Sequence, residues 1–313
     1  MTFNQKNFIL LLAGGVGAAK FIDGVAHVMD QKELKIIVNT GDDIELFGLR
    51  ICPDLDIITY TLANIIDREK GWGFKDESFN SLKILKKYYD IGWFNAGDKD
   101  LATHIYRTDL FKRGFSKAEI TKRICQKLGV KAKLIPMCNE DTPTYIETPK
   151  GKINFEQYYI KEACKPEVLN VIFKGIEKAK PVKGTIQLIK NAKKIIICPS
   201  NPIVSIGTIL AVPDMRKHLR KVSNKIIGIS PIIEGATVKG PADKLMKWKG
   251  LDVSCFGVAK YYQDILSYFI IDIRDKKYKK KIERELGINT YTFDTLMVDL
   301  KKKKKLARFV LGL

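Results

Sequence analysis

Cysteine and long apolar runs are both scarce in this sequence. Its six cysteines lie at least 13 positions apart, which excludes a CxxC metal motif and a dense disulfide framework. The apolar run Phe8–Ala13 stops at Gly14, so it is too short for a signal-peptide core or a membrane span. We therefore expect a cytoplasmic protein that has no targeting segment and does not act at a membrane.

Acidic residues are also outnumbered, at 35 against 55 Lys and Arg, which gives a formal net charge of +20. The first 100 residues nevertheless hold 15 acids and 12 bases, so the basic surplus belongs to the remainder of the chain. The lysines there are not interleaved with aromatic residues as in a nucleic-acid-binding stripe. We expect a solvated, lysine-rich surface and no nucleic-acid partner.

The order of hydrophobic residues predicts an α/β fold. A chain of 313 residues can bury a full core, as one large domain or as two ordinary ones. Short β-branched runs alternate with helical stretches, which is typical of strands buried on both faces of a parallel sheet. These runs are Phe8–Leu12, Lys35–Val38, Lys194–Cys198, Lys225–Ile229, Val253–Phe256 and Tyr268–Ile273. We expect a three-layer α/β/α, Rossmann-like sheet that is mostly parallel.

Two segments depart from this alternation. The pattern of residues 59–130 is helical and includes a capping box, Ser116 to Glu119. Residues 145–160 hold two alternating segments around Pro149–Gly151, which predicts a β-hairpin. Because no linker or repeat divides the chain, we expect a single α/β domain over 1–313 with a helical subdomain inserted at 59–130, in preference to two independent domains.

Three glycines, Gly14, Gly15 and Gly17, follow the first predicted strand and open a helix. Small residues there let backbone N–H groups approach a phosphate, whose charge the helix dipole favours. The motif departs from the dinucleotide fingerprint because Lys20 replaces the third glycine, and from the P-loop because no Ser or Thr follows Lys20. A plain strand-to-helix turn would use the same glycines.

Carboxylates are concentrated after the second predicted strand, where Asp42 and Asp43 precede Asp54 and Asp56. This position is the carboxyl edge of the sheet, beside the glycines. Two carboxylates about 4 Å apart repel by about 4 kcal/mol at an effective dielectric of about 20, so a converging set needs a cation or a shared proton. Mg²⁺ suits the position because it takes one or two carboxylates and substrate phosphate. Alternatively, these acids point to solvent from a loop.

Other predicted strand ends are polar or glycine-rich, and in combination they favour a ligand crevice. Asp98 opens a helix on which His104 and Arg107 share a face suited to a phosphate or a hydroxyl, although Asp98 would also serve as a helix cap. The loops after two later strands contribute Ser200, Asn201, Pro202, Ser205, Ser230 and Gly240. Each loop alone would be an ordinary strand-to-helix connection.

Together these motifs resemble the 2-phospho-L-lactate transferases of coenzyme F(420) biosynthesis along nearly the whole chain. The resemblance rests on Gly14–Gly17, Asn39–Asp43, Arg50–Asp56, Gly97–His104, Pro199–Pro202 with Ser205–Gly207, and Ser230–Ile233. One departure is Thr208, where the family more usually has proline.

The resemblance implies a reaction. A 2-phospho-L-lactyl (or phosphoenolpyruvyl) group would move from a guanosine diphosphate-linked donor to the ribityl hydroxyl of the deazaflavin Fo (7,8-didemethyl-8-hydroxy-5-deazariboflavin), giving F(420)-0 and GMP. Mg²⁺ is the implied cofactor, and the partners would be these small molecules. The acids and the glycine turn agree with this, because phosphoryl transfer depends on positioning and on charge neutralisation.

The resemblance also assigns roles to residues. Asp42 and Asp56 are implied as catalytic residues and metal ligands, Asp43 as a further ligand, and Asp54 as a second choice. Fo would contact Asp56, Asn95, Asp98 and His104, and some relatives have a basic residue in place of Asn95. The nucleotide and its phosphates would contact Gly14, Gly15, Gly17, Ser200, Asn201, Pro202, Ser205, Ser230 and Gly240. We expect Asp56 to lie in a loop at the sheet edge.

Two other functions stay open. A non-catalytic, nucleotide-sugar-binding regulator of a related family would share the glycine turn, but the run Arg50–Asp56 resembles the transferases. A nicotinamide dehydrogenase is disfavoured by the departure from the dinucleotide fingerprint. The choice between a lactyl and an enolpyruvyl donor depends on one small group and is left open. We expect a homodimer, the commonest oligomer.

Overall fold

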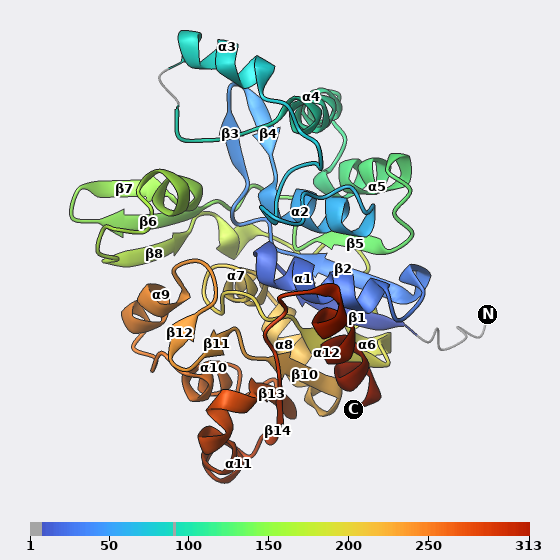
Figure 1. The fold of residues 1–313 in the computed structure, drawn as a ribbon, viewed down its shortest axis with the longest axis vertical. Helices are drawn as coiled ribbons and strands as arrows, with labels where there is room; N and C mark the ends of the chain where they lie inside the picture. Colours follow the sequence, from blue (N-terminus) through green and yellow to red (C-terminus); the bar gives the residue numbers. More distant parts are fainter. Residues whose placement is uncertain (1–7, 90–91) are drawn as a thin grey trace.

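The computed structural model describes residues 8–89 and 92–313, and its centre is a sheet of seven strands (Figure 1). Their order across the sheet is β14-β13-β10-β9-β1-β2-β5, and all neighbours pair in parallel. The strands are β1 Ile9–Ala13, β2 Leu34–Val38, β5 Lys133–Pro136, β9 Lys194–Ile197, β10 Ile226–Ile229, β13 Tyr268–Asp272 and β14 Asn289–Phe293. Because the order reverses between β1 and β9, a crevice is expected outside the carboxyl ends of these two strands.

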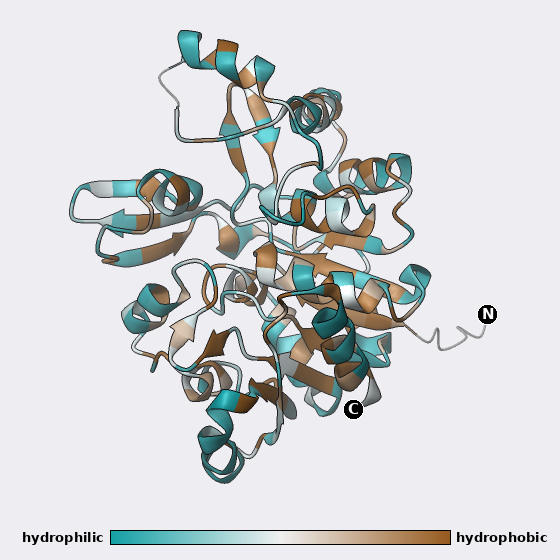
Figure 2. Cartoon of the chain, in the orientation of Figure 1, coloured by the Kyte–Doolittle hydropathy of each residue, from teal (hydrophilic) through white to brown (hydrophobic). Residues whose placement is uncertain are grey.

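Helices cover both faces of the sheet, because successive side chains of a strand point to opposite faces. Ile9 and Leu11 enter one hydrophobic core, and Leu10 and Leu12 enter the other. The first core is covered by α1 (Gly15–Ala26), α2 (Pro53–Leu62) and α12 (Leu300–Gly312), and the second by α6 (Thr185–Asn191), α7 (Ile206–Ala211), α8 (Met215–Arg220) and α10 (Cys255–Tyr261). The hydropathy colours agree, since the central strands are apolar and the outer helices largely polar (Figure 2). The predicted three-layer α/β/α fold is therefore confirmed.

For the central sheet, the sequence prediction includes one false strand and misses two strands. Val253–Phe256 is not a strand, because Ser254 accepts a hydrogen bond from the N–H of Gly257 at 3.1 Å and caps α10. A short apolar run does not distinguish a strand from a buried helix start. Conversely, β5 and β14 were not predicted. They are the two edge strands, and polar residues interrupt their apolar pattern.

Smaller elements extend from the carboxyl edge of the sheet (Figure 1). Residues 59–130 include the predicted capping box, at the start of α5, and are largely helical. The elements between β2 and β5 are the hairpin β3 (Ile44–Leu46) and β4 (Leu49–Ile51), then α2, α3 (Asn80–Tyr88), α4 (Asp98–Lys112) and α5 (Lys117–Lys127). Since α5 packs against β5 of the central sheet, the assignment of 59–130 as a separate subdomain stays a prediction.

The hairpin predicted within 145–160 is confirmed over residues 144–154 and belongs to a three-stranded antiparallel sheet. The last part of the predicted segment is a π-helix, Gln157–Lys161. That sheet consists of β6 (Thr144–Thr148), β7 (Gly151–Asn154) and β8 (Asn170–Phe173). The remaining elements are β11 (Ile232–Ile233), β12 (Ala236–Thr237), α9 (Ala242–Trp248) and α11 (Lys279–Leu286). Within the described residues, no helix combines the length and the apolar character needed to cross a bilayer.

The last helix, α12, packs closely on α1. Gly24 of α1 lies at the crossing, where an added Cβ would be 2.4 Å from the carbonyl oxygen of Lys303. Beside it, the buried carboxylate of Asp23 accepts hydrogen bonds from Lys303 Nζ at 3.0 Å and from Arg68 at 2.5 Å. Backbone contact and a buried ion pair therefore hold the C-terminal helix against the helix that begins at the glycine turn.

We predict that Gly24→Ala destabilises the protein by about 1–3 kcal/mol, because α12 must move away from the added methyl group. This cost exceeds the gain of about 1 kcal/mol from the higher helix propensity of alanine. Urea unfolding measures the difference. The matched control is Gly312→Ala in α12, where an added Cβ meets no atom within 4 Å. Equal stability of the two variants would show that the close approach is dispensable.

Candidate active site

A cavity of about 640 Å³ opens at the carboxyl ends of the strands where their order reverses. Its wall includes Gly14–Gly17 after β1, Asp42 after β2, Pro199–Asn201 after β9 and Ser230 after β10. Helices α2 and α4 and the segment after β7 supply further walls. This is the usual position of ligands in parallel α/β folds, and the volume is within the range of small-molecule sites.

Most of the predicted site residues line this cavity. They are Gly14, Gly15, Gly17, Asp42, Asp56, Asn95, His104, Ser200, Asn201, Ser205, Ser230 and Gly240. Asp43, Asp98 and Pro202 are not part of the wall. Pro202 is buried behind the loop, where its carbonyl oxygen lies 2.8 Å from the position of a Cβ on Gly207.

The glycine turn is required by contacts within the protein. A Cβ on Gly17 would lie 2.2 Å from the carbonyl oxygen of Pro199, and one on Gly14 would lie 2.7 Å from Asp54 Oδ2. Gly15 has a φ of +68°, in the region that favours glycine. Its N–H at the start of α1 donates to Asp54 Oδ1 at 2.6 Å. One of the donors predicted to face phosphate is therefore occupied by a carboxylate of the protein.

Asn39 holds two carboxylates side by side at the end of β2. Its Nδ2 donates to Asp42 Oδ2 at 3.0 Å and to Asp54 Oδ2 at 2.9 Å. The amide orientation is fixed because its oxygen accepts from the Gly41 N–H at 2.8 Å and from Thr208 Oγ1 at 2.6 Å. The hydroxyl of Thr208, the departure from the more usual proline, is equally close to the Ser205 carbonyl oxygen, so it is the Gly41 N–H that directs both amide hydrogens toward the acids.

Asp42 and Asp54 are buried and lack a cationic partner among the described residues. Burial, and then the charge of Asp54, raise the pKa of Asp42 well above its ordinary value. Burial also raises the pKa of Asp54, although hydrogen bonds from Asn39 and Gly15 oppose the shift. Asp42 Oδ1 is buried without a hydrogen-bond partner in the described part of the chain. An unpaired buried carboxylate oxygen is costly, and it marks this position as one that binds a positive group.

A third carboxylate, Glu156, faces this pair from the segment after β7 and was not predicted. It lines the cavity and is 7% exposed, and no described residue hydrogen-bonds to its side chain or forms an ion pair with it. Burial raises the pKa of Glu156 to about 8, helped by the charges of Asp54 and Asp43. No motif surrounds Glu156 in the sequence, because the packing of the three-stranded sheet against the central sheet brings it here.

Asp43 is separated from this pair by its own cationic partner. Lys117 Nζ lies 2.7 Å from Asp43 Oδ2, and both side chains are largely buried. Burial opposes the charge of Lys117, but Asp43 outweighs that effect and raises the pKa of the lysine. Asp43 does not line the cavity, but its charge still raises the pKa of Asp42, Asp54 and Glu156, so its role as a metal ligand stays a prediction.

Asp98 is a helix cap. Its carboxylate accepts hydrogen bonds from Ser78 Oγ at 2.6 Å, from the Ser81 N–H at 2.9 Å and from the Asn80 N–H at 3.1 Å. These bonds, led by that of Ser78, lower the pKa of Asp98. Asp98 thus secures the start of α3, a neighbouring helix and not the one that carries it, and its expected contact with Fo is not supported.

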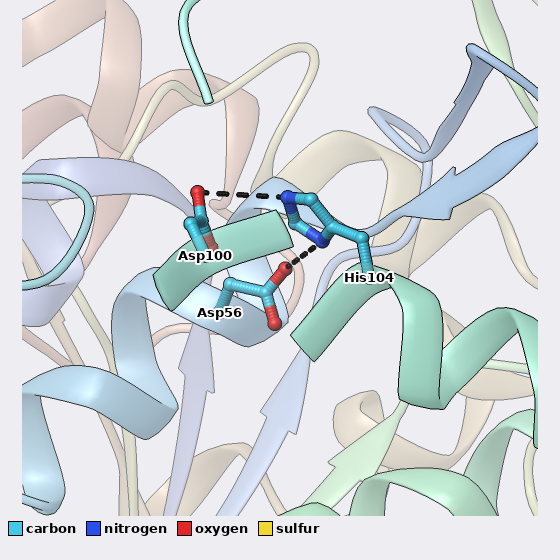
Figure 3. Close-up of side chains that lie close together, drawn as sticks. All are labelled: Asp56, Asp100 and His104. Atoms are coloured by element: carbon cyan, nitrogen blue, oxygen red, sulfur yellow. Dashed lines mark ion pairs between the residues drawn. The ribbon is translucent and has the colours of Figure 1, made fainter. Parts of the chain in front are cut away.

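Asp56 lies in the first turn of α2, not in a loop as expected, and it is paired with Arg107 of α4. Arg107 donates to both carboxylate oxygens, with Nη1 at 3.0 Å from Oδ2. His104 completes a chain between two acids: Nδ1 is 3.7 Å from Asp56 Oδ2, and Nε2 is 3.5 Å from Asp100 Oδ2 (Figure 3). The sequence predicted that His104 and Arg107 share a face for a phosphate or a hydroxyl, whereas in the structure Arg107 binds Asp56. Asp100 was not identified.

The trio Asp56, Asp100 and His104 has the spacing of metal ligands, with one ligand atom from each within 4.8 Å of the others. A cation is already present, however, because the Arg107 guanidinium binds both oxygens of Asp56 and donates to His104 Nδ1 at 3.1 Å. A metal ion would have to displace or repel that buried charge. This trio is better described as an internal hydrogen-bonded network.

Apolar rings and two lysines complete the wall. Tyr60, Trp72 and Phe94 lie on the wall formed near α2 and α4, while Phe155 and Tyr159 stack in parallel planes near Glu156, with centroids 6.0 Å apart. Lys20 and Lys239 also line the cavity, and burial lowers the pKa of both. Neither lysine pairs with an acid within the described residues. The cavity thus combines flat apolar surfaces with free charges of both signs.

Comparisons with known proteins agree with this geometry. Residues 9–309 match the family model described as 2-phospho-L-lactate transferase CofD. The chain is 38% identical over 305 residues to a 2-phospho-L-lactate transferase from Methanosarcina barkeri, covering 97% of this chain and 98% of the relative. It is 36% identical over 311 residues to a phosphoenolpyruvate transferase from Streptomyces griseus subsp. griseus, covering 97% and 98%.

A solved structure of a UPF0052-family protein from Bacillus halodurans superposes with a TM-score of 0.62, covering 98% of this chain and 99% of that one. At 15% sequence identity this likeness supports the fold alone. The family match covers nearly the whole chain, and the relatives align over nearly their whole length. This chain belongs to the 2-phospho-L-lactate transferase CofD family.

Proposed function

We propose that this protein transfers a 2-phospho-L-lactyl or phosphoenolpyruvyl group from a guanosine diphosphate-linked donor to the ribityl hydroxyl of Fo, releasing GMP. The observation that carries the proposal is the set of buried carboxylates without internal cations, Asp42, Asp54 and Glu156, beside the turn that opens α1. Relatives named for the lactyl donor and for the enolpyruvyl donor are similarly identical to the chain, so the proposal covers both.

The donor set fits Mg²⁺. Carboxylate oxygens are its preferred ligands, and it commonly uses one or two of them together with water and substrate phosphate. We assign Asp42 and Asp54 as the residues that would hold it, because Asn39 keeps them together and Asp42 Oδ1 has no other partner in the described chain. Asp56, which sequence resemblance also placed at the metal, is bound by Arg107, and we assign it to the acceptor. When bound, Mg²⁺ would neutralise charge on the donor diphosphate.

In the proposed reaction, the hydroxyl oxygen of the acceptor forms a bond to the phosphorus that carries the lactyl or enolpyruvyl group. The bond from that phosphorus to the GMP oxygen breaks, and GMP leaves with the bonding electrons. Asp56 lines the cavity in an orientation fixed by Arg107, and we assign it the hydrogen bond from the attacking hydroxyl and then its proton. Lys20 and Lys239 offer positive charge to the leaving phosphate. This division relies on positioning and electrostatics, as phosphoryl transfer requires.

We expect that the protein, given Fo, the donor and Mg²⁺, releases GMP in equal amount to the phosphodiester product, and that EDTA abolishes the release. Chromatography of both products measures the reaction, and parallel assays with the lactyl and the enolpyruvyl donor identify which is used. Binding of a UDP-sugar with no turnover of either donor would instead support a non-catalytic regulator.

We predict that Asp42→Asn stabilises the metal-free protein and removes its stabilisation by metal. Without metal, the variant should melt a few degrees above the wild type, because one of two adjacent buried charges is removed. The stabilisation by Mn²⁺, used as a probe for Mg²⁺, should be lost, and turnover should fall by about 100-fold or more. Thermal melting with and without Mn²⁺ measures the first two effects. The control is Asp109→Asn, which replaces a surface acid paired with Arg113 and should behave as the wild type. If Mn²⁺ raised the melting temperature of Asp42→Asn as much as that of the wild type, Asp42 would be excluded as a ligand.

Glu156 predicts a pH dependence of stability. Its pKa rises from the ordinary 4.5 to about 8 on folding, so the folded state favours the neutral acid. The contribution of neutral Glu156 to the stability of the folded protein is complete below a pH of about 4.5 and is lost as the pH rises through about 8. The melting temperature of the metal-free wild type should therefore fall between pH 5 and about 8, and that of Glu156→Gln should fall less. Glu167→Gln, at an exposed position, serves as control. If the melting temperatures of all three proteins changed with pH in parallel, the raised pKa of Glu156 would be contradicted.

A further inference from the structure

Asp100 of α4 is a cavity carboxylate to which the proposed reaction assigns no role. Its side chain is 12% exposed, compared with 7% for Asp56 and 1% for His104. Of the three residues in Figure 3, Asp100 therefore presents the most surface to the cavity. His104 lies between the two acids and is almost completely buried, so it offers a ligand far less surface than either acid does.

Two side chains fix the Asp100 carboxylate. Tyr60 donates from its hydroxyl to Oδ1 at 2.7 Å, and His104 Nε2 lies 3.5 Å from Oδ2. Glu77 fixes the backbone, accepting from the Asp100 N–H at 3.2 Å. Burial disfavours the charge of Asp100, but the neighbouring His104 ring, the hydrogen bond from Tyr60 and the charge of Arg107 outweigh it and lower the pKa of Asp100. Asp100 is thus held as an ionised hydrogen-bond acceptor.

Arg107 determines which nitrogen of His104 faces Asp100. Its Nη1 donates to His104 Nδ1 at 3.1 Å. Because a guanidinium keeps its protons in proteins, Nδ1 must present its lone pair, and this hydrogen-bond network assigns the ring proton to Nε2. Nε2 lies 3.5 Å from Asp100 Oδ2, so Arg107 orients Asp56 directly and fixes the ring nitrogen that faces Asp100.

We propose that Asp100 is a second acceptor-binding carboxylate, which accepts a hydrogen bond from a hydroxyl of the polyol chain of the acceptor, and that Tyr60, His104 and Arg107 are its positioning residues. Each carboxylate oxygen accepts about two hydrogen bonds, and the protein supplies one or fewer to each oxygen of Asp100. The remaining capacity suits a hydroxyl donor. Two fixed acceptors, Asp56 and Asp100, near the rings of Trp72 and Phe94, suit a flat ring system that carries several hydroxyls. The identity of this ligand as Fo rests on the proposed function.

The test is Asp100→Asn, which keeps the shape of the side chain and removes its charge. We expect the KM for Fo, and its Kd by equilibrium dialysis, to rise about 10- to 100-fold, as for loss of a hydrogen bond to a charged group. The KM for the donor should change less than about twofold. Asp109→Asn, on the same helix and exposed, is the matched control. Unchanged Fo binding, or equal weakening of Fo and donor, would overturn the proposal.

Two readouts separate positioning from a merely structural role. Tyr60→Phe removes one hydrogen bond that keeps Asp100 ionised, so the loss of Fo binding at acid pH should begin at higher pH than in the wild type. In the ¹⁵N spectrum of the three histidines, the His104 signals, assigned by their loss in His104→Gln, should show the proton on Nε2. An unchanged pH profile in Tyr60→Phe, or a proton on Nδ1, would contradict the network.

If the proposed function itself is wrong, the experiments give a different result from the one expected if only the role of Asp100 is wrong. A wild type that neither binds Fo nor releases GMP refutes the reaction and the ligand together, whatever the histidine spectrum shows. A wild type that binds Fo and releases GMP, with Asp100→Asn behaving in the same way, refutes only the role of Asp100.

Discussion

The structure of the site depends on one constraint, which is that a single amide holds two buried carboxylates together. Asn39 donates to Asp42 and Asp54, and its own oxygen is fixed by the Gly41 N–H. A buried carboxylate pair is unfavourable unless a cation or a proton joins it. The fold provides no cation for the pair within the described residues, and a third acid, Glu156, faces it. These acids therefore need either a bound cation, as in the proposed function, or a proton, which their raised pKa values favour.

Acids that are adjacent in the sequence have different partners in the fold. Asp43 pairs with Lys117 and Asp56 with Arg107, both of which come from later helices. The sequence pattern predicted one converging cluster, because it shows where acids follow a strand but not which cation reaches each of them. Residues 51 or 74 positions away decide that question, and they do so only once α4 and α5 have packed. Local spacing therefore located the site but did not assign its charges.

The same limit explains which parts of the fold were predictable. Central strands such as β1 and β9 are continuous apolar runs because both of their faces are buried. The edge strand β14 carries polar residues, and the apolar run at Val253–Phe256 became the start of a buried helix capped by Ser254. Glu156 and Asp100 gave no signal for a related reason. Glu156 is an isolated acid, and Asp100 is not distinguished from the nearby Asp98 by the sequence. The place of each in the cavity depends on the docking of the three-stranded sheet or of α4.

The cavity contains two kinds of carboxylate, and the difference follows from their internal partners. An acid that is neutralised by a nearby arginine or held by hydrogen bonds, such as Asp56 or Asp100, does not attract a further cation, but its free lone pairs can still orient a hydroxyl. An acid without such a partner, such as Asp42, stays electrostatically unsatisfied until a cation binds. Because both kinds of carboxylate line one cavity, the cavity can treat two ligands differently. In the proposed reaction, the diphosphate donor would be bound through its negative charge and the polyol acceptor through its hydroxyls.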